Sequence, residues 1–215
     1  MRDFPVFTTE NGAASIVLRE VPYKGIAYIT LRDTLMPHLL LAECVDFCKT
    51  VGAIKIYATG HSILEGYPVF TKVLRMQQLR EQLRQSDAAL FPLTEKTLNH
   101  WRSLYNDRME NVPNASTMTR EDGEKLLQRG AGYFVHRNGN LLGIGIAQGD
   151  TIEAIAAIQP GAGEDVLLAL CGALFSERVV IEVASTNVPA IRLYERLGFL
   201  KTEELTCWYD VCQHF

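Results

Sequence analysis

The sequence has 215 residues, of which 47% are apolar and 21% charged, a balance typical of one large soluble domain or two small ones. Its formal net charge of −4 excludes broad binding to a nucleic-acid backbone, which requires a basic surface. No apolar run reaches the roughly 18 residues of a membrane helix, and the first residues lack the apolar segment of a signal peptide. The five cysteines, an odd number without a paired framework, favour a reducing cytoplasm. We therefore expect a cytoplasmic protein that binds neither nucleic acid nor membrane.

Strand-like and helix-like segments alternate in the first half of the chain. Asn11-Gly12 lies between two strand-like runs and predicts a tight hairpin turn. Pro37 begins a helical pattern that Gly52 ends. Residues 77–85 are polar and charged, as in a helical tail or a linker, and we place a domain boundary at their end. The predicted elements are a hairpin over 5–21, strands over 25–31, 54–59 and 67–76, and a helix over 37–50.

The second half begins with two predicted helices and continues with strands. Thr94 is the expected N-cap of the first helix, and Thr119 with Asp122 forms a box-like cap for the second. Asn138-Gly139 predicts another hairpin turn. The predicted elements are helices from 94 and over 119–130 and 166–176, and strands over 133–136, 141–148, 151–158, 179–183 and from 199 onward.

A short helix near the end of the chain carries the most specific pattern. Asn187 is a good N-cap, Pro189 fits the first turn, and Gly198 ends the helix. The strand-like run before it makes the unit a strand, a turn and a helix. One apolar face of the helix consists of Ala190, Leu193, Tyr194 and Leu197.

This unit resembles the acetyl-coenzyme A end of the GNAT N-acetyltransferase family, whose pattern is N-x-x-A-x-x-L-Y-x-x-x-G-F. The order of predicted elements also resembles the GNAT fold over about residues 90–215. The resemblance implies an α/β protein with the acyl-CoA N-acyltransferase fold, a mixed and mostly antiparallel sheet flanked by helices. The fixed places of the pattern are filled by Asn187, Ala190, Leu193, Tyr194, Gly198 and Phe199.

An internal repeat links the two halves. Residues 39–56 align without gaps on 166–183, at an offset of 127 residues. Two accounts remain open: buried strand–helix–strand units look alike, or the chain is a tandem of two GNAT-like halves. The second account predicts a degenerate GNAT-like N-terminal domain over 1–85 and a GNAT acetyltransferase domain over 86–215. Since the first half lacks the signature helix, its role would be structural.

The resemblance also implies roles for single residues. Tyr194 would donate a proton to the departing coenzyme A thiolate, although an aromatic residue on an apolar helix face is also a normal core residue. Glu153 would remove a proton from the amine through water, or else face solvent at a strand edge. Asn187 would lie near the pantetheine arm while it also caps its helix.

The predicted phosphate-binding loop departs from the family. The family binds the coenzyme pyrophosphate on Q/R-x-x-G-x-G/A at a helix start, after a strand that ends V-x-P. Here the strand ends Ile158-x-Pro160, and the following loop is about four residues shorter. Glu164 falls on a glycine position, where its charge opposes a pyrophosphate; the alternative is a tight turn with ordinary acidic capping. The resemblance assigns coenzyme contacts to Ile155, Ala156, Ala157, Ile158, Gly161, Ala162, Gly163, Glu164, Asn187, Ala190 and Tyr194.

The leading hypothesis is an N-acetyltransferase that moves an acetyl group from acetyl-CoA to a primary amine by direct attack. The alternatives are a non-catalytic GNAT-like protein that binds acyl-CoA or a protein partner, and a transferase with another acyl or aminoacyl donor. The acceptor would be a small-molecule amine or a peptide, and the N-terminal half would cover the acceptor cleft or mediate a homodimer. No metal site is expected, because the cysteine pairs lack histidines at zinc spacing. The charged run over 80–84 is interpreted as a solvated surface.

Overall fold

A computed structural model describes residues 5–212 of the chain. These residues form two compact units, one containing the chain up to Lys72 and from Leu205 onward, the other Val73–Glu204. The packing therefore divides the chain differently from a boundary after residue 85, and the tandem ancestry of the two halves stays a prediction. Among the described residues, none of the helices combines the length and apolar character needed to cross a bilayer.

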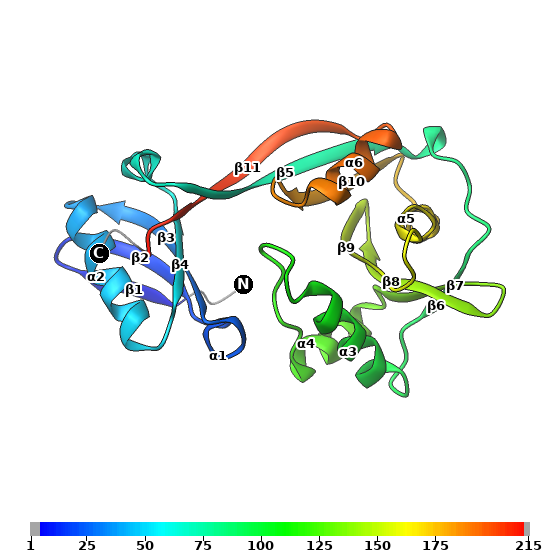
Figure 1. Cartoon of the computed structure of the whole chain (residues 1–215), viewed down its shortest axis with the longest axis horizontal. Helices are drawn as coiled ribbons and strands as arrows, with labels where there is room; N and C mark the ends of the chain where they lie inside the picture. The colour runs from blue at the N-terminus through cyan, green and yellow to red at the C-terminus, as the bar shows by residue number, and fades with distance from the viewer. Residues whose placement is uncertain (1–4, 213–215) are drawn as a thin grey trace. The chain divides into compact units, whose positions relative to one another are not determined.

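The first unit is a sheet with one covering helix (Figure 1). Its strand order is β1-β2-β3-β4-β11, and the predicted Asn11-Gly12 hairpin is confirmed by the antiparallel pairing of the first two strands. The helix α2 packs on this sheet through buried side chains such as Leu41, Cys44 and Val45. The elements are β1 (Val6–Thr9), β2 (Gly12–Val17), α1 (Val21–Lys24), β3 (Ile26–Thr34), α2 (Pro37–Thr50) and β4 (Lys55–Thr59).

The second unit has helices on both faces of its sheet (Figure 1). Its strand order is β5-β10-β9-β8-β7-β6. The core with α5 and α6 lies on one face, and the core with α3 and α4 on the other, because neighbouring residues such as Phe134 and Val135 point to opposite faces. The elements are β5 (Val69–Leu79), β6 (Ala89–Pro92), α3 (Leu98–Met109), α4 (Arg120–Arg129), β7 (Gly132–Arg137), β8 (Asn140–Gln148), β9 (Thr151–Ala157), α5 (Gly163–Cys171), β10 (Arg178–Ala184), α6 (Val188–Arg196) and β11 (Leu200–Asp210).

Most predicted elements are confirmed, and the differences lie at their ends. The capping box of Thr119 and Asp122 is present at the start of α4. The α3 helix begins later than predicted, because the Thr94 hydroxyl pairs with that of Thr97 at 2.9 Å. The α5 helix runs from Gly163 to Cys171 rather than over 166–176. The helical tail proposed for 77–85 is wrong, because β5 continues into it before a short 3₁₀ turn.

The strand–helix–strand segments that form the sequence repeat have the same topology. In the first unit β3, α2 and β4 follow one another, and in the second β9, α5 and β10. Each strand pair is parallel, and each partner lies 29 residues further along the chain: Lys55 faces Ile26, and Val180 faces Thr151. This agreement in register is what a tandem origin would produce, and it is also compatible with two independent units of the same kind.

Candidate functional site

The two central parallel strands of the second unit separate soon after they begin. The register of β9 with β10 consists of two pairs, Thr151 with Val180 and Ile152 with Ile181. From Glu153 onward β9 keeps its antiparallel partner β8 but no longer pairs with β10. The edge of β9 that faces β10 therefore has backbone N–H and C=O groups available for a ligand.

A β-bulge lies at the point of separation. The register between β8 and β9 shifts at Ile146 and Ala147, so that Glu153 is the extra residue opposite them. Bulges bend a strand and redirect its side chains, and they occur often beside functional sites. The predicted contact residues Ile155, Ala156 and Ala157 follow on the part of β9 that has left β10.

The first unit provides an internal comparison. There β3 and β4 pair at five positions, from Ile26 with Lys55 to Thr30 with Thr59. These two parallel strands therefore remain paired at positions where the corresponding strands of the second unit, β9 and β10, have already separated. Of the two strand–helix–strand segments, only the one in the second unit has this opening within the described residues.

The strand end and the start of α5 are joined by a tight loop. Ile158 and Gln159 both donate their N–H groups to the Leu142 carbonyl, at 2.8 and 3.2 Å. Gly161 has φ of +82°, a left-handed conformation that favours glycine, and Ala162 is the N-cap residue without a side-chain cap bond. The helix start therefore keeps backbone donors that a side chain does not cap.

Three arginines surround the two acidic residues in the first turn of α5. Glu164 accepts hydrogen bonds from Arg84 at 2.8 Å and from Arg196 at 3.1 Å. Asp165 pairs with Arg137 at 2.6 Å, and Arg84 lies 3.7 Å from it. The Arg84 hydrogen bond, followed by that from Arg196, lowers the pKa of Glu164. Arg84 is exposed, in line with the interpretation of 80–84 as a solvated surface, and it also pairs with Glu164, which lies 80 residues away in the sequence.

The signature helix α6 lies beside this helix start. Asn187 caps it by accepting a hydrogen bond from the Ala190 N–H at 3.4 Å. A Cβ atom at Gly163 would lie 3.3 Å from the Leu193 side chain, so the α5 start and the apolar face of α6 are close neighbours. The loop after β9 and the signature helix are thus brought together, although more than 20 residues separate Gly163 from Asn187 in the sequence.

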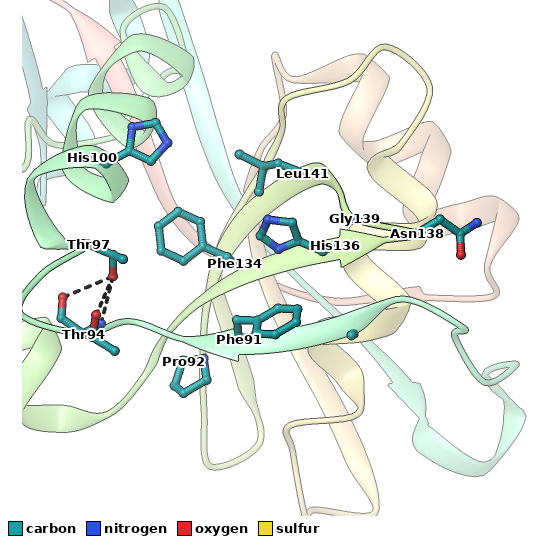
Figure 2. Close-up of a pocket in the computed structure, with 11 residues that line it drawn as sticks. Phe91, Pro92, Thr94, Thr97, His100, Phe134, His136, Asn138, Gly139 and Leu141 are labelled. Atoms are coloured by element: carbon teal, nitrogen blue, oxygen red, sulfur yellow. Dashed lines mark hydrogen bonds between the residues drawn. The ribbon is translucent and has the colours of Figure 1, made fainter.

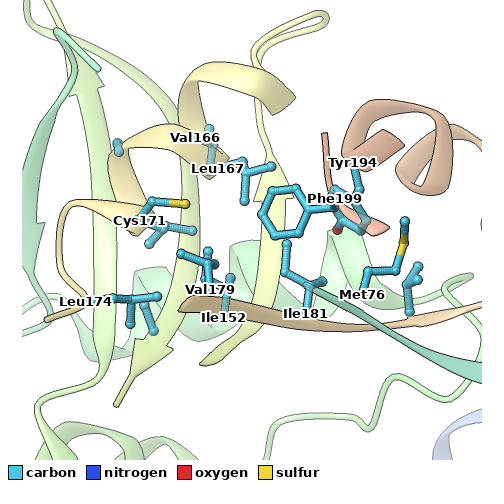
Figure 3. Close-up of a cluster of buried hydrophobic side chains, with 14 of the residues drawn as sticks. Met76, Ile152, Val166, Leu167, Cys171, Leu174, Val179, Ile181, Tyr194 and Phe199 are labelled. Atoms are coloured by element: carbon cyan, nitrogen blue, oxygen red, sulfur yellow. The ribbon is translucent and has the colours of Figure 1, made fainter. Parts of the chain in front are cut away.

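Tyr194 belongs to the core of the second unit. It is 7% exposed, and its ring lies beside Phe199 at 6.0 Å between centroids (Figure 3). Burial raises the pKa of Tyr194 to about 12, so the phenol is protonated at neutral pH. Its hydroxyl makes no hydrogen bond within the part of the chain that the structure describes. A buried phenol without a partner is available as a donor to a bound group.

Glu153 lies on β9 and is paired with an arginine from a helix. Its carboxylate forms an ion pair with Arg129 at the end of α4, and that arginine also donates to Gln148 at 2.9 Å. The side chain of Glu153 is 39% exposed, so water reaches it. Arg129 and the three arginines at α5 were not found from the sequence, because their partners lie on other elements. No group of three or more metal-ligating side chains occurs in residues 5–212.

Comparison with known proteins supports the fold. No family model and no curated protein matches the sequence. In structure the chain is similar to a GCN5-related N-acetyltransferase from Sphaerobacter thermophilus, with TM-score 0.60 and 9% identity over 93% of this chain and 76% of that one. It is also similar to an acetyltransferase of the GNAT family from Colwellia psychrerythraea, with a TM-score of 0.52 and 14% identity over 95% of this chain and 84% of that one. A third similar structure is that of a conserved protein of unknown function from Staphylococcus epidermidis, with a TM-score of 0.59 and 12% identity over 98% of this chain and 94% of that one. The chain has the GNAT fold.

Proposed function

We propose that the chain is an N-acetyltransferase that transfers an acetyl group from acetyl-CoA to a primary amine. The observation that carries this proposal is the separation of β9 from β10 after Ile152, a residue that shares one hydrophobic core with α5 and Tyr194. This combination offers an extended backbone edge for an amide-containing chain, backbone donors for phosphate, and a proton donor. The acceptor would be a small amine or the amine of a peptide.

The donor substrate would lie along the free edge of β9. The pantetheine amides would pair with backbone groups of Ile155 to Ala157, in the way that an added strand pairs with a sheet edge. Ala154, Ala156 and Ala157 leave room there because their side chains are small. The pyrophosphate would take the backbone N–H groups of Gly161 and Gly163, since that of Ala162 donates to the Gln159 carbonyl at 3.2 Å. Arg84 and Arg196 would then exchange Glu164 for phosphate oxygens, since guanidinium groups bind both kinds of oxyanion.

In the reaction the neutral amine attacks the thioester carbon, and a C–N bond forms as the C=O π electrons move to oxygen. When the carbonyl re-forms, the C–S bond breaks and the electron pair leaves with sulfur. Tyr194 would donate its proton to that thiolate. The nitrogen that has attacked carries a positive charge and loses one proton, so the protons gained and lost are equal. Glu153 would accept the amine proton through water, with Arg129 positioning its carboxylate.

The test is calorimetric titration of acetyl-CoA into the protein, with Tyr194→Phe as the matched variant. We expect micromolar binding to both proteins, because the change removes one hydroxyl that has no partner in the free protein. In a screen of amine acceptors, Tyr194→Phe should lower kcat by ~10²-fold or more, the usual contribution of a general acid. Absence of binding at millimolar acetyl-CoA would refute the proposal.

A second candidate is a non-catalytic GNAT-like protein that binds acyl-CoA or a protein partner. The ion pairs of Glu164 and Asp165 favour the protein partner, because they occupy the helix start that a pyrophosphate would need. Binding of acetyl-CoA with equal affinity in Tyr194→Phe, but without turnover of any amine, would select this candidate.

A further inference from the structure

A cavity of about 640 Å³ lies at the outer corner of the second unit's sheet (Figure 2). Its floor is formed by β6, β7 and the start of β8, and its wall by the beginning of α3. The volume lies within the range of small-molecule sites. The cavity is distinct from the opening at β9, because none of the described residues that line it belongs to β9, α5 or α6.

Four of the eleven residues that line the cavity carry aromatic or imidazole rings. Phe91 on β6 is 51% exposed and meets His136 edge-on, at 5.1 Å between centroids and 85° between planes. His100 from α3 lies nearly parallel to Phe134, at 6.1 Å and 13°. Figure 2 shows these four rings in a row from His100 through Phe134 and His136 to Phe91, with Leu141 close to His136. Flat π faces and edges of this kind suit an aromatic ligand.

The charge of the lining restricts the ligand further. Among the described residues that line the cavity there is no carboxylate, lysine or arginine. The hydroxyls of Thr94 and Thr97 already pair with each other at 2.9 Å. The other polar side chains that line the cavity are those of His100, His136 and Asn138, and an imidazole N–H can donate a hydrogen bond to an acceptor.

A strand from a second protein is a poorer occupant of this corner. The edge strand β6 has only four residues and ends in Pro92, which cannot donate a backbone hydrogen bond. The cavity is open to solvent, and its volume of about 640 Å³ is that of a site for a compact molecule. We propose that this cavity is a second ligand site, which binds a flat aromatic small molecule that carries a carboxylate or another hydrogen-bond acceptor.

The first test titrates 2-naphthoate into the full chain by calorimetry, with cyclohexanecarboxylate as the non-aromatic control probe. We expect saturable binding of one naphthoate per chain, and binding of the control at least tenfold weaker. Ala89→Trp fills the cavity from an exposed position, so it should weaken naphthoate binding at least tenfold while the thermal unfolding curve stays unchanged. His100→Phe keeps an aromatic ring at an exposed position and removes the imidazole, so it should weaken naphthoate severalfold.

Phe175→Ser is the matched control, because Phe175 is 94% exposed and lies outside this cavity. It should leave the affinity unchanged. Equal naphthoate affinity in Ala89→Trp and the unaltered chain would overturn the proposal, as would a lack of saturation at millimolar probe. Sedimentation that shows a dimer which Ala89→Trp dissociates would also overturn it, because this corner would then be an interface between copies.

Discussion

Glu164 is the residue at which this chain departs most from a phosphate-binding helix start. A carboxylate in the first turn of α5 stabilises the helix dipole but repels a phosphate at the same place. Arg84 and Arg196 compensate for that charge in the free protein, with hydrogen bonds of 2.8 and 3.1 Å. The acidic turn is therefore an electrically balanced cluster rather than a bare negative charge, which the sequence alone did not indicate.

We predict that Glu164→Gln strengthens acetyl-CoA binding. The change removes one negative charge and leaves Arg84 and Arg196 free to contact phosphate, which we expect to contribute about 1 kcal/mol, or ~5-fold in Kd. Calorimetric titration at low and high salt measures the effect, which should shrink with salt. Glu195→Gln on the exposed side of α6 is the charge-matched control and should change little. Unchanged or weaker binding in Glu164→Gln would exclude this role for the carboxylate.

At the scale of elements, the site depends on how closely α5 approaches the sheet. Gly143 on β8 lies under this helix, where a Cβ atom would be 2.6 Å from the Val166 side chain and 2.5 Å from the Ala156 carbonyl oxygen. Backbone atoms of β9 cannot yield to such a contact as a flexible side chain does. The absence of a side chain at this position therefore lets α5 lie against the strand that forms the opening.

We predict that Gly143→Ala destabilises the second unit by about 1–3 kcal/mol, the usual cost of overpacking. It should also weaken acetyl-CoA binding, because α5 and β9 must move apart. Urea unfolding and calorimetry measure the two effects. Gly66→Ala is the control, since a Cβ atom there meets nothing within 4 Å, and it should alter neither quantity. If Gly143→Ala kept full stability, the prediction would be wrong, because α5 could then move away from the sheet without a measurable cost in free energy.

At the scale of the whole molecule, two long strands connect the compact units. β5 begins in the first unit and continues into the second, and β11 begins in the second and ends in the first. The last residues of β11 pair with β4, Tyr209 facing Ala58 and Asp210 facing Tyr57. The first unit therefore consists of two separate segments of the chain, whereas the second unit is one continuous segment.

We predict that a chain ending at residue 204 loses stability in its first unit. The truncation removes the β4 partner strand, the buried Val211 and the contact of Trp208 with Tyr28, which lies at 5.1 Å between ring centroids. Hydrogen exchange should show at least tenfold faster exchange of β4 amides, while amides shared by β8 and β9 keep their protection. Equal protection of β4 in both chains would contradict this view of β11.

We predict that stability falls as the pH rises above about 9. Burial raises the pKa of Tyr194, Tyr28, Cys44 and Cys171 to about 12, whereas the ordinary values are 10 for tyrosine and 9 for cysteine. Between these limits the unfolded chain has already lost protons that the folded chain keeps, so alkali favours unfolding. The urea midpoint should therefore be lower at pH 11 than at pH 8.

Cys44→Ala provides the control for this pH dependence, because it removes one of the titrating groups. It should lower stability at pH 8 through lost packing, and it should show a smaller further loss between pH 8 and pH 11. A midpoint that is independent of pH over this range would contradict the prediction.

The sequence by itself determined the elements and their order, because these depend on local chemistry. The turn at Asn11-Gly12, the capping box at Thr119 and the cap at Asn187 act within a few residues, and each was predicted correctly. The pattern over 187–199 also led to the GNAT fold, since that helix keeps a fixed spacing of residues.

Only the tertiary structure decided how the site is built. The opening beside β9 arises because pairing with β10 stops after Ile152, and strand pairing is set by distant residues. The pairing of Arg84 with Glu164 spans 80 residues, and the first unit combines the chain up to Lys72 with the residues from Leu205 onward. The ring-lined cavity likewise joins three strands and a helix. Local patterns carry no signal for such contacts, because they form between side chains and strands that only the fold brings together.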